Sequence, residues 1–254
     1  MISNSNRDFA FQSCFFPGNM VYNRQYFTQL IPEVSQMRIT KRLRLAALML
    51  LTAILISCLG GCVVIGARKP ICTILFSDGG EVRIRLYPDK CPNTVNNFIK
   101  LCNSGFYDGS TVHRIMEYVL VQMGMPANST ETDAGYYIKG EFTANNYSKG
   151  DLTFEKGIVG MARLSDNSES KKFFDTASSQ FFIMLEPKQS MDGYYAAFGK
   201  VISGMEEIIA ISKMDVDASN YPRDDIHIVS ARVDCYDYKP SEPKTIDKSK
   251  VNLF

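Results

Sequence analysis

The stretch that decides the fold is GSTVHRIMEYVLVQMGM, residues 109–125. It contains two short apolar runs, 111–116 and 119–125, with a brief break between them. Each run has the length of a β-strand, and the break is short enough to be a tight turn. The stretch therefore predicts two antiparallel strands that meet at a turn.

Both runs carry polar residues that an ordinary strand would not need. His113 and Arg114 lie in the first run and Gln122 lies in the second. Two strands joined by a tight turn can direct a guanidinium and an amide into one pocket, with Val119 and Leu120 forming its floor. The alternative is an antiparallel pair that simply carries Arg114 and Gln122 on its solvent face.

Three motifs follow this stretch along the chain. They are GIVGMAR at 157–163, SQFFI at 179–183 and AFGKV at 197–201. Together with HRI and VQMG, and in this order and spacing, they resemble the cyclophilin family of peptidyl-prolyl isomerases. The resemblance covers about residues 70–238, which are expected to form the isomerase domain.

The segments before the central stretch predict a hairpin and a helix. Residues 81–87 alternate between apolar and charged side chains and follow the apolar run 71–77 across a DGG turn. Pro92 opens a helix at a position where its missing N–H costs nothing. Ser203 and Glu206 form the capping-box pattern of a second helix. The first helix has an apolar stripe at Val95, Phe98, Ile99 and Cys102.

The later segments complete a β-rich pattern. Further short strands are predicted at 157–163, 180–185, 196–202 and 226–233. About eight short strands and two helices, without the long spacing of βαβ units, predict a mainly β fold. We expect a closed eight-stranded antiparallel barrel with the two helices over its openings, and the resemblance implies the same cyclophilin-like barrel.

The resemblance also implies roles for individual residues. Arg114 would be the donor that stabilises the twisted peptide bond, and Gln122 would orient it and bind the substrate backbone. The implied proline pocket and neighbouring groove consist of Val119, Leu120, Phe182, Met191, Tyr195, Ala162, Arg163 and Gln180. His113 is interpreted as a satisfied structural histidine, because as the neighbour of Arg114 on a strand it should point away from Arg114. The alternative for Gln180 is a simple surface residue.

Three positions depart from the family pattern. Val119 stands where phenylalanine is usual, Ser190 where a large apolar residue, often tryptophan, is expected, and Tyr195 where histidine is usual. The first two changes shrink the apolar wall, and the third keeps an aromatic ring with a polar tip. These changes predict low activity and bring the binding of cyclosporin-type inhibitors into question.

Composition limits the other possibilities. The chain has 254 residues, of which 45% are hydrophobic, so it suits one good-sized domain with extra segments. The net charge of +1 does not indicate a nucleic-acid partner. Seven cysteines without metal-type spacing and two histidines predict no metal and no cofactor. Pairing among Cys72, Cys91, Cys102 and Cys235 stays open, although Cys72 and Cys235 could be neighbours.

The pattern of the first 69 residues indicates an N-terminal extension followed by a signal segment. Residues 1–36 have no helical or strand period and are expected to be disordered or wrongly assigned to the protein. Residues 37–69 combine a basic start with the apolar run 45–56, as in an N-terminal signal. The basic residues are Arg38, Lys41, Arg42 and Arg44. The polar residues 239–254 are expected to form a flexible tail.

The end of the apolar segment resembles a bacterial lipobox. In Leu59-Gly60-Gly61-Cys62 the cysteine would be acylated, and Cys58 is a poorer second match. The alternative is a transmembrane helix, since about 20 apolar residues span a bilayer. Both interpretations predict a domain anchored at the extracytoplasmic face of a bacterial cell membrane.

These features lead to an expected function. The chain is expected to be a monomeric prolyl isomerase that acts on proline-containing polypeptides and assists the folding of exported proteins. The alternative is a catalytically weak domain that binds proline-containing segments as a chaperone or adaptor. A third possibility, a ligand-binding β-barrel lipoprotein, conflicts with bulky inward residues such as Phe98, Phe181 and Ile183.

Overall fold

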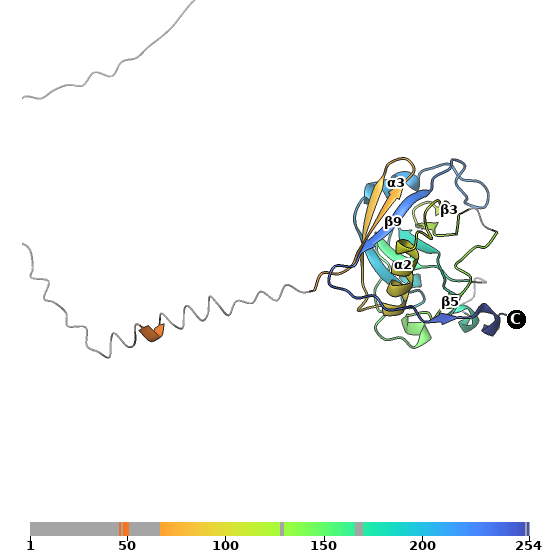
Figure 1. Ribbon diagram of the computed structural model, residues 1–254. Coiled ribbons are helices and arrows are strands. Elements are labelled where there is room, and N and C mark those ends of the chain that lie inside the picture. The colour runs from red at the N-terminus through yellow and green to blue at the C-terminus, as the bar shows by residue number, and fades with distance from the viewer. Residues whose placement is uncertain are drawn as a thin grey trace, which may run out of the picture. The chain divides into compact units, whose positions relative to one another are not determined.

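The computed structural model describes residues 46, 48–50, 67–127, 130–165, 170–251 and 253 (Figure 1). Residues from Ile65 onward belong to one compact unit. Residues 46 and 48–50 are helical, and no helix among the described residues is long and apolar enough to cross a membrane. The extension 1–36, almost all of the signal segment and Cys62 lie outside the described residues.

The domain is built on one antiparallel sheet of eight strands in the order β3-β4-β7-β6-β8-β2-β1-β9. Buried side chains alternate with more exposed ones along β1 and β2, as the period of two along a strand requires, whereas β6 and β7 are buried on both faces. The strands are β1 (Ile71–Phe76), β2 (Glu81–Leu86), β3 (Val112–Met116), β4 (Leu120–Met123), β6 (Ile158–Met161), β7 (Phe181–Met184), β8 (Ala197–Ser203) and β9 (Ile228–Asp234).

The prediction of a closed barrel is wrong, because the sheet is open between its edge strands β3 and β9. Backbone hydrogen bonds join residues 109–112 to 226–228 at one end, including Val112 N to Ile226 O at 3.0 Å. Beyond that point the two edges separate, since Ile115 N donates to Asn220 O in the loop before β9. The sheet is therefore curled, and a loop occupies the remaining gap.

Two helices pack on the sheet, α2 (Pro92–Asn103) and α3 (Met205–Ile211) (Figure 1). Helix α2 starts at Pro92 as predicted and buries its whole apolar stripe. The ring of Phe98 lies 5.0–5.6 Å from the rings of three core aromatics, Tyr107, Phe181 and Phe198. The predicted capping box is wrong, because α3 begins after Gly204 at φ 81° without a side-chain cap.

The start of α2 is capped by a residue far away in sequence. The buried carboxylate of Glu141 accepts hydrogen bonds from Asn93 N at 3.1 Å, Thr94 N at 2.8 Å and Thr94 Oγ1 at 2.8 Å. A negative charge also interacts favourably with the positive end of a helix. Glu141 thereby ties the long segment after β4 to the helix that fills the sheet.

We predict that Glu141→Ala lowers the free energy of unfolding by about 2–3 kcal/mol, because it leaves two buried donors of Thr94 and the half-buried Asn93 N without their acceptor. Denaturant unfolding measures the change. The exposed Glu155 provides the matched control, and Glu155→Ala should change the stability by less than about 0.5 kcal/mol. Equal losses in both variants would contradict the capping role.

The C-terminal segment differs from the flexible tail that the sequence predicted. Strand β10 (Thr245–Ile246) pairs with β5 (Tyr137–Ile138) to form a second, two-stranded sheet. Lys244 N donates to Asn93 Oδ1 at 2.7 Å, so the tail also contacts the start of α2. Short 3₁₀ helices complete the fold, η1 (Thr143–Asn145), η2 (Lys171–Phe173), η3 (Gln189–Met191) and η4 (Lys248–Lys250).

The cysteines of the domain are free thiols. The nearest pair is Cys72 and Cys102, whose buried Sγ atoms lie 3.8 Å apart between β1 and α2. Cys235 is half-buried and lies beyond β9. The side chain of Cys72 is buried in the core, so its nearest cysteine is Cys102 of α2 and not Cys235, which the sequence had suggested as a neighbour.

Candidate active site

A row of residues across five strands brings the predicted site together. The register aligns Arg114 on β3 with Gln122 on β4, and Gln122 with Phe182 on β7. The row continues through Gly160 on β6 to Ala197 on β8. Phe182 belongs to a separate apolar cluster from its neighbour Phe181, which packs on α2, because successive residues of a strand point to opposite faces.

The polar half of the site is a chain of hydrogen bonds. Arg114 is exposed, and its Nη1 donates to Gln122 Oε1 at 3.4 Å. Gln122 Nε2 donates to Gln180 Oε1 at 2.8 Å, and Gln180 Nε2 donates to Thr132 O at 2.7 Å. These bonds fix the two amides and leave most of the guanidinium donors of Arg114 available to a ligand.

His113 belongs to the same network. Its Nε2 lies 3.1 Å from Gln180 Oε1, because an irregularity in the β3–β4 register between Val112 and Arg114 changes the alternation at this point. Burial lowers the pKa of His113 from its ordinary value of 6.5. The neutral imidazole therefore donates its Nε2–H to Gln180, which is a network residue rather than a simple surface residue.

We predict that this lowered pKa makes the domain lose stability as the pH falls below about 6.5. The unfolded chain takes up the proton first, so the contribution of His113 is complete above that pH and decreases towards the folded-state pKa. Thermal melts at about pH 7.5 and about pH 5.5 should show a smaller acid-induced decrease in His113→Gln than in the wild type. An undiminished acid-induced decrease in His113→Gln would contradict this role of His113.

The apolar half of the site is a compact cluster on the same side of the sheet. Phe182 and Leu120 are buried in it, and their partly exposed neighbours form its rim. The rings of Phe182 and Tyr195 are 5.8 Å apart and nearly perpendicular. The predicted residues that the structure brings to this cluster are Val119, Leu120, Ala162, Phe182, Met191 and Tyr195.

Phe154 is a member of this cluster that the sequence analysis missed. It is buried, and its ring lies 5.7 Å from that of Phe182 and 6.4 Å from that of Tyr195. Its backbone N donates to Asp192 Oδ1 at 2.7 Å, which ties it to the segment carrying Met191. The available signal was that Phe154 is the only aromatic residue in the polar stretch 148–157.

Arg163 supports the site through its side chain. Its guanidinium lies 4.4 Å from the ring centroid of Tyr195 and 5.2 Å from that of Phe174, and its Nε donates to Tyr194 O at 3.1 Å. Stacking of this kind fixes an aromatic ring. Arg163 therefore helps to hold Tyr195 in place beside Phe182.

A small polar cavity of about 80 Å³ continues the site beside Gln122 and Gln180. Its other lining residues are Thr132, Asp133, Ala162, Arg163, Leu164, Thr176 and Ser178. The site thus combines an apolar cluster with partly exposed rim residues, an exposed arginine and a small polar cavity. Such a combination of apolar and polar groups suits an extended peptide, with an apolar ring against the cluster and its backbone along the amides.

This arrangement suits rotation about an X-Pro peptide bond. The barrier of roughly 18–20 kcal/mol arises from amide resonance, and no nucleophile or proton transfer is needed to lower it. What is needed is a pocket for the proline ring and a fixed donor for the charge that shifts as resonance is lost. The partly exposed rim of the cluster around Phe182 offers an apolar surface for the ring, and Arg114 provides such a donor.

Comparisons with known proteins agree with this chemistry. The sequence profile described as "Cyclophilin type peptidyl-prolyl cis-trans isomerase/CLD" matches residues 71–233. Peptidyl-prolyl cis-trans isomerase B of Bacillus subtilis is 39% identical over 142 residues, covering 56% of this chain and 90% of the relative. Human peptidyl-prolyl cis-trans isomerase-like 3 is 33% identical over 155 residues, covering 61% of this chain and 90% of the relative.

Solved structures give the same result. A crystal structure of a Cryptosporidium parvum cyclophilin type peptidyl-prolyl cis-trans isomerase, obtained in the presence of the dipeptide Ala-Pro, matches with a TM-score of 0.55 at 25% identity. The match covers 65% of this chain and 98% of that one. The curled sheet, the arginine-containing groove and these matches lead to one conclusion: the chain belongs to the cyclophilin family of peptidyl-prolyl cis-trans isomerases.

Proposed function

We propose that this isomerase acts on proline-containing segments of exported polypeptides while it is tethered to the extracytoplasmic face of a bacterial membrane. The observation that carries the proposed site is the row in which the exposed Arg114, the amide of Gln122 and the ring of Phe182 are successive neighbours. In this proposal the proline ring lies against Phe182, Leu120 and Met191.

The proposed mechanism assigns one task to each polar group. Gln122 binds the substrate backbone and orients Arg114, whose Nη1 lies 3.4 Å from Gln122 Oε1. As the peptide bond twists, the proline nitrogen regains its lone pair, and the guanidinium of Arg114 donates to it. A planar and permanently charged donor suits this task because it does not have to be created during the reaction.

A proline-limited refolding assay tests catalysis against simple binding. A catalyst present at a small fraction of the substrate concentration raises the rate constant of the slow refolding phase, whereas a chaperone or adaptor at the same ratio does not. The smaller apolar wall at Val119 and Ser190 favours a modest rate. No acceleration together with measurable affinity for a proline peptide would support the binding alternative instead.

The proposed tether rests on the basic start at 38–44, the apolar segment that follows it and the sequence LGGC ending at Cys62. Two acyl chains on that cysteine would give stable anchoring. We predict that Cys62→Ser blocks maturation in a bacterial host, whereas Cys58→Ser, the matched control, leaves it intact. The mass of the mature N-terminal peptide measures both. Normal processing of Cys62→Ser would contradict the lipoprotein interpretation and favour the alternative, a membrane-spanning helix.

A further inference from the structure

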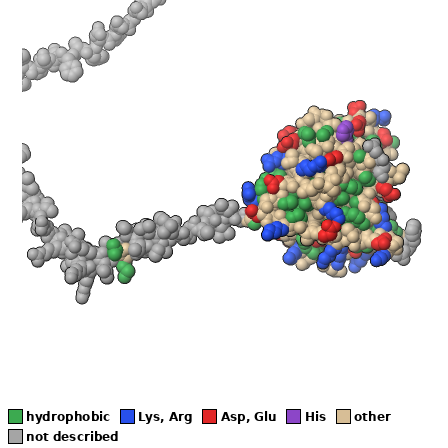
Figure 2. Space-filling model, viewed as in Figure 1, with side chains coloured by type: hydrophobic (Ala, Val, Ile, Leu, Met, Phe, Trp, Pro, Cys, Tyr) green, Lys and Arg blue, Asp and Glu red, His purple; other side chains and the backbone are tan. Residues whose placement is uncertain are grey.

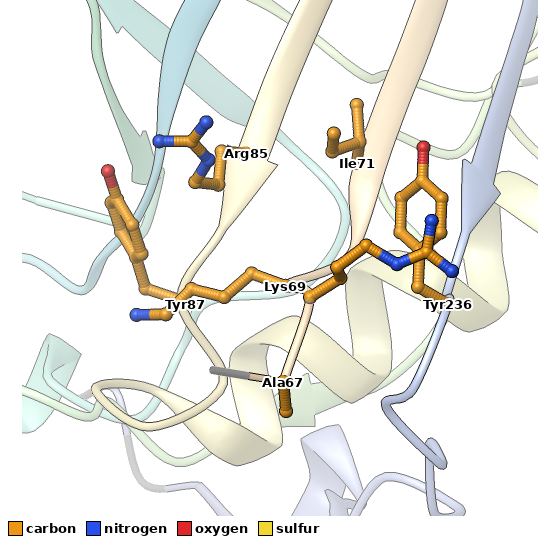
Figure 3. Close-up of a pocket in the computed structure, with 7 residues that line it drawn as sticks. Ala67, Lys69, Ile71, Arg85, Tyr87 and Tyr236 are labelled. Atoms are coloured by element: carbon orange, nitrogen blue, oxygen red, sulfur yellow. The ribbon is translucent and has the colours of Figure 1, made fainter. Parts of the chain in front are cut away.

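A hollow of about 510 Å³ lies where the described chain enters the domain, away from the peptide site (Figure 3). Its lining combines basic and aromatic side chains from the entering segment, from β1 and β2, and from the residues after β9. The lining residues are Ala67, Arg68, Lys69, Ile71, Arg85, Tyr87 and Tyr236. Figure 2 shows Lys and Arg side chains beside this point of entry.

Two of the cations are held in place by aromatic rings. The guanidinium of Arg68 lies 4.4 Å from the ring centroid of Tyr236, and Lys69 Nζ lies 4.7 Å from that of Tyr87. Each cation also has a carboxylate nearby. Arg68 Nε is 4.0 Å from Asp237 Oδ2, and Lys69 Nζ is 2.8 Å from Asp89 Oδ1.

Positive charge in excess of the nearby carboxylates comes from the neighbouring strands β2 and β8. The register places Arg85 of β2 directly opposite Lys200 of β8, and like charges at such positions are destabilising. Within the ranges that the structure describes, neither side chain has a carboxylate partner. Arg83 lies two residues before Arg85 and so shares its face of the sheet. We call Arg68, Lys69, Arg85 and Lys200 the basic face.

The sequence position of this basic face indicates its partner. Ala67 follows directly on the apolar segment that begins at residue 45, and Arg68 and Lys69 come next. With at most about 3.3–3.6 Å of chain per residue, a few residues of linker hold the basic face within one or two nanometres of anything that binds that segment. Tyrosine rings such as those of Tyr87 and Tyr236 are also typical of membrane interfaces.

We propose that the basic face binds the anionic phospholipid headgroups of the membrane that holds the preceding segment. This inference rests on the proposed tether. Basic residues next to a membrane anchor attract anionic lipids, each by an amount equivalent to about fivefold in binding. The peptide site runs from β3 through β4, β7 and β6 to Ala197 of β8 and shares no residue with the basic face, so lipid binding leaves the peptide site open to substrate.

Lysine footprinting of the full chain on vesicles tests the proposal. One set of vesicles contains only phosphatidylcholine, and the other also contains phosphatidylglycerol. We expect acetylation of Lys69 and Lys200 to slow by about fivefold or more on the anionic vesicles only. This protection should disappear near 1 M salt, where the screening length falls to about 3 Å. Lys213, beyond α3, should react equally on both sets and serves as the internal control.

A pair of variants identifies the residues involved. Arg85→Gln should reduce the protection of Lys200 about fivefold, whereas Arg223→Gln, which removes an exposed arginine from the loop before β9, should not. Both variants should keep full isomerase activity, which verifies their folding. Equal protection in both variants would overturn the assignment of Arg85 to the basic face.

The outcomes separate the inference from the tether on which it rests. Retention on phosphatidylcholine vesicles reports the tether alone. If the chain is retained there but Lys200 reacts equally on both sets, the basic face is wrong and the tether stands. If the chain is retained only on anionic vesicles with Lys200 protected, the tether fails and the basic face stands. No retention on either set overturns both.

Discussion

Replacing Arg114 with alanine is expected to lower kcat/KM for proline isomerisation by about 10²–10³, the loss typical of one preorganised donor to a developing charge. The fold should be unaffected, because Arg114 is exposed and its side chain donates only a long hydrogen bond of 3.4 Å to Gln122 among the described residues. Proline-limited refolding gives the rate, and a thermal melt of the same sample shows that the variant is folded.

Two further variants sharpen this expectation. Arg114→Lys should lose nearly as much activity, because a compact ammonium group cannot reproduce the planar fork of guanidinium. Arg223→Ala removes an exposed arginine from another loop and should retain full activity. Full activity in Arg114→Ala would show that another group supplies the stabilisation.

Gly160→Ala is expected to disturb the apolar cluster around Phe182 and Phe154. A Cβ at this position would lie 2.3 Å from Phe182 Cζ and 2.7 Å from Phe154 Cε1, so both buried rings would have to shift. Overpacking of this kind costs typically 1–3 kcal/mol of stability. A displacement of about 1 Å in substrate-positioning groups can cost about 10²-fold in rate. We therefore expect a loss of kcat/KM of that order, measured where the variant is still folded.

Gly199→Ala provides the matched control. Its Cβ would lie 2.9 Å from Ile84 Cγ2 and 3.0 Å from Arg85 O, so it crowds the β2–β8 contact instead of the pocket. A comparable loss of stability with nearly unchanged kcat/KM is expected. If both variants lose activity equally, general loosening of the sheet accounts for the effect, and the rings over Gly160 have no special role.

The local elements were predictable because their signals are local. The alternation in 81–87, the start of α2 at Pro92 and the turn between β3 and β4 all depend on neighbouring residues. The clustering of Arg114, Gln122 and Phe182 could not be obtained from spacing alone. It came from the resemblance to a family whose strand order is already known.

The errors concern contacts between distant segments. Glu141 caps the helix that begins at Pro92, and the sequence around these two residues does not predict that they lie close together. The tail looked loose because it is polar, yet its hydrogen bonds use polar groups of α2 and β5. The prediction of a closed barrel was wrong because the number of strands does not show where the two edge strands of a sheet separate.

Strand β1 pairs with β9, so the first strand of the eight-stranded sheet is completed by the last strand of that sheet to be synthesised. The residues just before β3 bond to the same late segment. Pairings between such distant segments form slowly, because a long loop must close before they do. A chain still being made therefore lacks one of the two strands that pair with β1. Such a chain becomes a catalyst for other chains only once its whole domain has been synthesised.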